Sequence, residues 1–237
     1  MGHIFTIIFY QPVLNLLVFF YNILPGHDIG LVIVALTVAI KLILWPLSQR
    51  ALKSQQVISQ LQPKIKEIQN KYKDNKEEQG RAMMALYREA KVNPTSSCLP
   101  LLIQLPFLWA VFRVFRDGLS NKSLALVYPF ISRPELLQTT SFGIIDLSKP
   151  NIFLAILTGL AQYFQAKTAT RQIPPAAGSQ AEELSSIMNK QMLYFMPVMT
   201  VAICWRLPSG LSLYWFLSSI LTILQQIYWF KKHKHNN

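Results

Sequence analysis

Residues 29–47 read IGLVIVALTVAIKLILWPL, an apolar run whose only charged residue is Lys41. A helix needs roughly 20 apolar residues to cross a bilayer, so we expect a transmembrane helix here. A charge inside such a helix costs at least about 2.5–3.5 kcal/mol on insertion scales, and it therefore usually faces a polar cavity or a partner. The alternative is that Lys41 snorkels to the nearer interface, because Ser48 lies only about 10 Å further along the helix. Lys41 is the first functional candidate in the chain.

The composition is that of an integral membrane protein. The 237 residues are 51% hydrophobic and only 14% charged, and several apolar runs approach the length of a span. We expect an all-α fold with five transmembrane helices, at residues 28–48, 98–116, 151–166, 191–206 and 207–230. The connections predicted between and after them are a cytoplasmic helical hairpin at 49–97, an outer loop at 117–150, a cytoplasmic loop at 167–190 and a basic cytoplasmic tail at 231–237.

The first 27 residues are apolar but interrupted by polar side chains. Gln11-Pro12, Asn15 and Asn22 break the run, and it carries no lysine or arginine. A secretory signal needs a basic start and a small-residue cleavage site, which are missing here. We interpret residues 1–27 as an amphipathic helix in the membrane interface. A sixth transmembrane helix is the alternative.

The distribution of basic residues predicts the orientation. Ten lysines and arginines lie between Ser48 and Ser97, and the first 28 residues contain none. Basic loops of multi-pass proteins stay in the cytoplasm. We therefore expect the N-terminus outside and the C-terminus in the cytoplasm.

The long basic loop has the pattern of two short helices. Apolar residues recur at intervals of four and three on a helix beginning near Pro63, and Asp74 followed by Glu77 predicts a second helix that Asn93-Pro94 ends. Two such helices joined by a polar turn form an antiparallel hairpin. The alternative is a solvated basic loop with no defined partner.

The sequence carries no recognisable catalytic motif. None of the four histidines belongs to a metal-ligand spacing, no serine occupies a G-x-S-x-G setting, and no glycine-rich phosphate loop occurs. We expect a protein that is not an enzyme and that needs no metal or cofactor.

Uncharged polar residues inside the predicted spans accompany Lys41. Thr37 lies one helical turn before Lys41 and shares its face. Amides and hydroxyls also occur in the second, third and fifth spans, at Gln104, Thr158, Gln162, Gln165, Ser212, Ser218 and Ser219. Each could bond only to a neighbouring helix, which is a common structural use of such residues in membranes. Together they could instead line one wet cavity with a single positive charge.

Several ordered segments resemble the YidC/Oxa/Alb family of membrane protein insertases, over roughly residues 10–230. The matching segments are Pro46-Leu47, Leu61-Gln62-Pro63-Lys64-Ile65, Met83-Met84-Ala85-Leu86-Tyr87, Lys91-Val92-Asn93-Pro94, Cys98-Leu99-Pro100-Leu101-Leu102-Ile103-Gln104-Leu105-Pro106, Met196-Pro197 and Leu207-Pro208-Ser209-Gly210-Leu211-Ser212-Leu213-Tyr214-Trp215. The resemblance implies a five-helix core around a hydrophilic groove that opens to the cytoplasm and to lipid. It also implies a minimal core that lacks the large outer domain of some relatives.

The resemblance assigns roles to individual residues of this chain. Lys41 aligns with a groove charge that is usually arginine, so the positive charge is kept while the fixed fork of the guanidinium is lost. Thr37, Gln104 and Tyr214 match positions that line the groove or contact substrate, and Trp215 stands where a second aromatic residue is common.

The function implied is that of an insertase and assembly chaperone in a bacterial inner or plasma membrane. Its substrates would be nascent membrane proteins, and the Sec translocon, the ribosome and the signal recognition particle pathway are candidate partners. A channel or transporter subunit is a rival, although such proteins usually carry ionisable residues on several spans and internal repeats. A chaperone that packs helices without inserting them would need the same apolar groove.

Overall fold

The computed structural model describes residues 3–93, 99–117, 123, 125–134, 138–170 and 191–233. Nearly all of the expected cytoplasmic loop at 167–190 and the end of the basic tail lie outside these residues. In the described part the chain is helical apart from turns and one two-stranded antiparallel sheet, formed by β1 (Thr140–Ser141) and β2 (Ile145–Asp146). This small sheet is the one departure from the expected all-α fold.

The N-terminal segment is one continuous helix made of three parts. These are α1 (His3–Phe5), a π-helical turn η1 (Thr6–Tyr10) and α2 (Gln11–Ile23), followed by the short 3₁₀ turn η2 (Pro25–His27). Pro12 lies just after the π-helical turn and removes one backbone donor there. The helix buries Leu14, Leu17 and Val18 against α3 and α7.

The expected first span is divided by a sharp bend. Helix α3 (Ile29–Ile43) ends at Leu44, and α4 (Trp45–Gln60) continues at an angle of 62°. Pro46 stands in the first turn of α4, where a missing backbone N–H is tolerated, and a proline is a common cause of such a bend. The transmembrane helix expected at residues 28–48 is therefore broken near Leu44, and helical structure continues beyond its expected end to Gln60.

The basic segment forms the expected pair of helices, α5 (Gln62–Lys71) and α6 (Lys76–Glu89). The side chain of Asn75, one residue after the predicted Asp74, caps α6 by accepting a hydrogen bond from the Glu78 N–H. Ile65 and Leu86 are buried, and the Gln79 amide donates to the Gln69 carbonyl across the hairpin.

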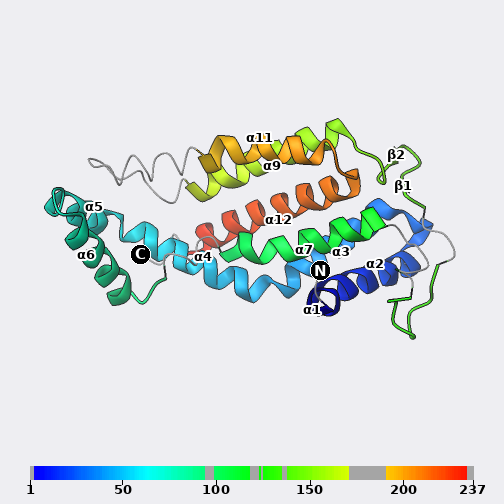
Figure 1. Cartoon of the computed structure of the whole chain (residues 1–237), viewed down its shortest axis with the longest axis horizontal. Coiled ribbons are helices and arrows are strands. Elements are labelled where there is room, and N and C mark those ends of the chain that lie inside the picture. Colours follow the sequence, from blue (N-terminus) through cyan, green and yellow to red (C-terminus); the bar gives the residue numbers. More distant parts are fainter. Residues whose placement is uncertain are drawn as a thin grey trace.

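The remaining helices lie close to the predicted spans. They are α7 (Leu99–Asp117), α9 (Ile152–Thr170), the π-helical turn η4 (Gln191–Phe195) with α11 (Met196–Cys204), and α12 (Ser209–His233). Figure 1 shows α9 and α11 on one side of the molecule and α2 on the other, with α12, α7 and α3 between them. The hairpin α5–α6 projects from one end, and β1 and β2 lie at the opposite end.

The main core lies where α2, α3, α7 and α12 meet. Its fully buried members include Leu14, Ile33, Leu36, Val111 and Tyr214. Helix α9 packs against both α11 and α12, and a methyl group added at Gly159 would overlap Val201 of α11. A small residue at such a crossing allows two helices to approach closely.

The segment around β1 and β2 fastens the ends of two helices. The Asp28 carboxylate caps α3 and accepts hydrogen bonds from the Ser141 hydroxyl and the Phe142 N–H. At the start of α12, the backbone N–H groups of Ser209 and Gly210 donate to the carbonyls of Lys149 and Leu147. These contacts satisfy donors that a helix N-terminus leaves free, so they hold α3 and α12 together at this end.

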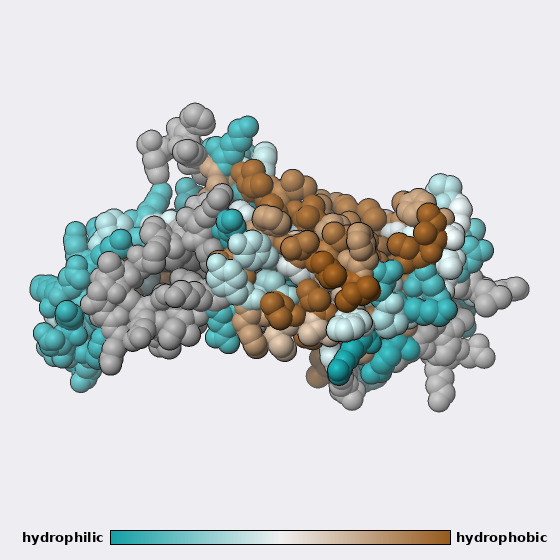
Figure 2. Space-filling model, turned by 90° about the horizontal axis from the view of Figure 1, so that it is seen from above, coloured by the Kyte–Doolittle hydropathy of each residue, from teal (hydrophilic) through white to brown (hydrophobic). Residues whose placement is uncertain are grey.

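The surface has an apolar belt between two polar ends. Figure 2 shows this belt on the face formed by α9 and α11, with hydrophilic surface towards the hairpin and towards the strands. Exposed apolar residues on α9 recur every fourth residue, at Ile152, Ile156, Leu160 and Phe164.

Two described helices, His3–Ile23 and Ser209–Lys232, are long and apolar enough to cross a membrane, and the bent pair α3–α4 makes a third if it counts as one span. The chain is therefore a helical membrane protein with two or three candidate spans by length and composition. The N-terminal helix is therefore also long and apolar enough for the alternative interpretation of residues 1–27, in which it is a sixth transmembrane helix.

Candidate functional site: a polar cavity inside the apolar belt

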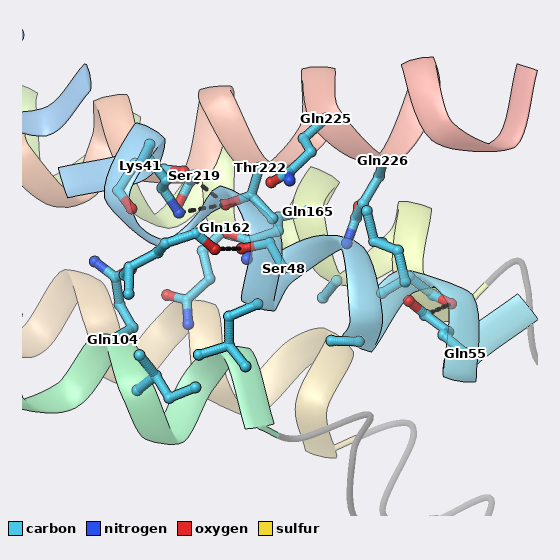
Figure 3. A pocket seen from close by; sticks show the side chains of 18 of the residues that line it. Lys41, Ser48, Gln55, Gln104, Gln162, Gln165, Ser219, Thr222, Gln225 and Gln226 are labelled. Atoms are coloured by element: carbon cyan, nitrogen blue, oxygen red, sulfur yellow. Dashed lines mark hydrogen bonds between the residues drawn. The ribbon is translucent and has the colours of Figure 1, made fainter. Parts of the chain in front are cut away.

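A cavity of about 190 Å³ opens among five helices of the bundle. Helices α3, α4, α7, α9 and α12 line it, together with Met196 at the start of α11. Its polar lining residues are Lys41, Ser48, Gln55, Gln104, Gln162, Gln165, Ser218, Ser219, Thr222, Gln225 and Gln226. Figure 3 shows most of these side chains converging on one space.

Lys41 is the only charged residue in the described lining of the cavity. It extends from the last turn of α3 towards α12, where its Nζ donates a hydrogen bond to Thr222 Oγ1 over 2.8 Å. Lys41 is partly buried, lines the cavity and reaches across to α12, so its side chain lies on the inner side of α3. This geometry differs from that of a snorkelling lysine, whose ammonium would extend along the helix to the interface.

The bend after α3 determines which residues share the cavity with Lys41. Because α4 turns by 62°, its residues Ser48, Ala51, Leu52 and Gln55 form one wall. Their spacing of three and four places them on one face of α4. The Gln55 amide donates to the Ala169 carbonyl over 3.1 Å and connects this wall to the end of α9.

Three of the predicted glutamines lie in the cavity lining, on two facing helices. Gln104 of α7 donates to the Tyr214 hydroxyl over 2.8 Å, and Gln162 of α9 accepts from the Thr200 hydroxyl of α11. Gln165 lies one turn further along α9, and the indole of Trp215 on α12 completes this part of the wall.

The other three predicted site residues lie outside the cavity lining. Thr37, Thr158 and Tyr214 are fully buried, at 1%, 0% and 0% exposure. Thr37 donates to the Ile33 carbonyl, and Thr158 donates to the carbonyls of Leu154 and Ser212. The Tyr214 hydroxyl is bonded to Gln104, and each of the three residues lies nearer the strand end of its helix than the lining residues of that helix. We call these three residues the floor of the cavity.

Sequence reasoning noted Ser218 and Ser219 but missed five other polar residues of the lining, which lie on α4 and α12. On α12, Thr222, Gln225 and Gln226 continue the face of Ser218 at intervals of three and four, and this polar stripe within an apolar helix is a signal that could have identified them. Ser48 is the last residue of the expected first span, and Gln55 lies beyond its end. Both residues line the cavity because of the bend after α3, which the sequence pattern did not predict.

The cavity can hold a polar or acidic segment of another molecule. Serine, threonine and glutamine side chains both donate and accept hydrogen bonds, and Lys41 adds donors for an anion. No aspartate or glutamate lies in the described lining to neutralise Lys41. Such a site lowers the cost of removing polar groups from water at the depth of an apolar belt.

Comparison with known proteins gives a consistent set of relatives. The family described as 60Kd inner membrane protein matches residues 19–236 of the chain. Three curated relatives carry the name membrane protein insertase YidC. The proteins from Endomicrobium trichonymphae and Syntrophobacter fumaroxidans are 33% and 34% identical over 92% and 94% of this chain. The protein from Fusobacterium nucleatum is 33% identical over 86% of this chain.

The extent of the match differs among these relatives. The chain covers 38% of the length of the Endomicrobium and Syntrophobacter proteins and 87% of the length of the Fusobacterium protein. The family match at residues 19–236 includes every residue that lines the cavity.

Proposed function

The chain belongs to the 60Kd inner membrane protein family, and from this premise we propose that it is a membrane protein insertase and assembly chaperone. It accepts a nascent membrane protein in the polar cavity and releases the apolar segment into the bilayer. The observation that carries this proposal is a cavity with one lysine and many amides and hydroxyls, set among helices whose outer faces are apolar.

In this mechanism the polar flank and the apolar segment of a substrate move to different places. A short polar flank enters the cavity, where Lys41 and the neighbouring amides replace part of its lost hydration. The apolar segment meanwhile leaves sideways into lipid. Burial of its surface supplies about 25 cal/mol per Å², so this step needs no nucleotide.

Five membrane-spanning segments are part of the same proposal. They are α3 with the start of α4, α7, α9, η4 with α11, and α12. Helix α3 and the unit η4–α11 are short, with 15 and 14 residues, or about 22 and 21 Å at 1.5 Å per residue. A bilayer core of about 30 Å would have to thin around them, which shortens the path of a polar flank.

The N-terminal helix lies in the outer interface in this arrangement. Three of its polar side chains bond to one loop: Gln11 and Asn15 donate to the Leu126 carbonyl, and Asn22 donates to the Ser132 carbonyl. Contacts with one surface loop along most of the helix favour an interfacial position over a span. The N-terminus is then outside, and the basic hairpin and C-terminus are in the cytoplasm.

The proposed partners follow from the substrate. Nascent membrane proteins arrive from the ribosome, through the signal recognition particle pathway or from the Sec translocon. The basic hairpin α5–α6 on the cytoplasmic side is the part of the chain best placed to meet them.

Reconstitution of the purified chain tests this function. Lipid vesicles containing the chain should insert a short single-span substrate made by cell-free translation, measured as protection of its translocated flank from protease. Protein-free vesicles and vesicles with an unrelated helical membrane protein are the controls. Equal protection in all three would contradict an insertase.

A further inference from the structure

Two adjacent glutamines of the cavity have buried polar atoms without a partner. Gln225 and Gln226 of α12 are 8% and 6% exposed. Gln225 Nε2 and Gln226 Oε1 make no hydrogen bond within the described part of the chain. Figure 3 shows both side chains extending from α12 towards the space between α12 and α4.

These amides lie at a different level of the cavity from Lys41. Lys41 bonds to Thr222, and Gln226 stands one helical turn further along α12, about 6 Å towards the hairpin end. Gln55 of α4, the lining residue labelled near Gln226 in Figure 3, already donates to a backbone carbonyl of α9. The hairpin end of the cavity is therefore lined by neutral amides rather than by charge.

We propose that Gln225 and Gln226 bind the main chain of the entering polypeptide, so that this end of the cavity recognises peptide groups and not side chains. This inference rests on the proposed insertase function and specifies which groups of the substrate this end of the cavity binds. One free N–H donor and one free carbonyl acceptor together complement the carbonyl and N–H of a peptide group.

The physical need for such a contact comes from the membrane. Main-chain groups without a hydrogen-bond partner are costly in a dry environment, and an extended flank has not yet formed the helix that would satisfy them. An anion or a lipid phosphate would prefer the Lys41 level, where a positive charge is available. A neutral donor and acceptor pair fits an unfolded polypeptide of any sequence.

The unpartnered amides also predict opposite effects on stability and binding. A buried donor or acceptor without a partner destabilises the free protein, so an apolar replacement of similar size relieves that cost. Gln225→Met with Gln226→Met should therefore raise the thermal unfolding temperature. The same double variant should bind substrate more weakly, because the bound state loses two hydrogen bonds.

The binding probe is a synthetic fluorescent peptide with about 20 apolar residues and a short flank of glycine and serine. Binding to the chain in lipid nanodiscs is followed by fluorescence anisotropy. We expect the double variant to bind about three- to thirtyfold more weakly. Ser212→Ala is the matched control, because Ser212 of α12 also has a buried side-chain oxygen without a partner among the described residues but lies outside the cavity lining. It should leave binding unchanged.

A second peptide separates main-chain recognition from any other role. Its side chains are the same, but ester bonds replace amide bonds in the flank, which removes N–H donors and weakens the carbonyl acceptors. The esters should weaken binding to the wild-type chain and leave binding to the double variant unchanged. Equal weakening of both proteins, or of neither, would overturn the inference and leave water or a lipid headgroup as the occupant of this site.

The two proposals fail in different ways. If vesicles containing the wild-type chain insert no substrate, the insertase function itself is wrong. If they insert both the amide and the ester substrate equally well, the function stands and main-chain recognition by Gln225 and Gln226 is wrong.

Discussion

At the scale of single residues, the position of Lys41 links the sequence to the proposed chemistry. A lone charge in an apolar run is costly, and here it lies on the inner side of α3 with Thr222 as its partner. A threonine hydroxyl satisfies one of three ammonium donors and carries no charge. The remaining donors are available to a carboxylate of a substrate flank.

Replacement of Lys41 should reduce the insertion of substrates with acidic flanks more than that of substrates with neutral flanks. Lys41→Ala should reduce insertion of a substrate with an acidic flank roughly tenfold, equivalent to about 1.4 kcal/mol, and affect a neutral flank less. Lys41→Arg should keep or improve activity, because a guanidinium stays charged and can bind a carboxylate with two hydrogen bonds. The measurement is insertion into vesicles that contain equal amounts of folded protein.

The opposite result has a clear meaning for Lys41. If it had only a structural or snorkelling role, the alanine variant would insert both substrates as well as the wild type. That outcome would remove the electrostatic role of Lys41, while the amides of the cavity could still lower the cost of dehydration.

A second residue, Asp146, makes the loop at the strand end sensitive to acid. The Ser148 hydroxyl and N–H donate to its carboxylate, and these hydrogen bonds hold the pKa of Asp146 below its usual range. Because this pKa is lowered, the Asp146 carboxylate stabilises the folded protein fully above the ordinary pKa of about 4. This stabilisation is lost as the pH falls further. Asp146→Asn should therefore lower the unfolding temperature slightly at neutral pH, and the difference from wild type should shrink in acid. A difference that does not shrink between about pH 5 and pH 2 would contradict this role of the carboxylate.

At the scale of elements, the hairpin α5–α6 is built as a separate unit. Its two helices pack on each other, and in Figure 1 it projects beyond the rest of the bundle. Met84 is half exposed, and both helices carry basic residues on their surfaces. A projecting unit of this kind suits contact with a substrate or a targeting partner better than support of the core.

Removal of the hairpin should impair insertion and leave the bundle folded. We expect this result when a flexible linker replaces residues 66–89, because the main core lies in α2, α3, α7 and α12. Resistance of the detergent-solubilised protein to protease reports folding, and the vesicle assay reports insertion. Loss of protease resistance in the other helices would assign the hairpin a structural role.

The helices themselves could largely be predicted from the sequence, and the bend could not. Apolar runs and proline positions locate α7, α9 and α12 to within a few residues, because hydrophobic burial sets their length. Pro46 was visible in the sequence, but a proline in the first turn of a helix is tolerated with or without a bend. The direction of α4 depends on packing against α7 and α12, which periodicity does not encode.

The same limit explains which site residues were found. Lys41, Gln104, Gln162 and Gln165 attract attention because a polar side chain is unusual inside a span. Gln225 and Gln226 lie near the polar end of α12, where glutamine is ordinary, and only their burial in three dimensions distinguishes them.

At the scale of the whole molecule, orientation can be tested with single cysteines. In a variant with Cys98 and Cys204 replaced by alanine, Lys73→Cys in the hairpin and Ile144→Cys in the outer loop should be labelled from opposite sides of intact cells. Ile144 is 84% exposed and so provides a reactive reference site. An impermeant maleimide should label only the Ile144 position. Labelling of the Lys73 position from outside would reverse the proposed topology.

The floor of the cavity, made of Thr37, Thr158 and Tyr214, has a consequence for the energy supply of a cell. These side chains are fully buried, and each makes a hydrogen bond. We infer that this floor interrupts any file of water between the cavity and the other end of the bundle, and protons or sodium ions need such a file to cross. A bacterium could therefore keep many copies of this protein in its membrane without dissipating the ion gradients that drive its ATP synthesis.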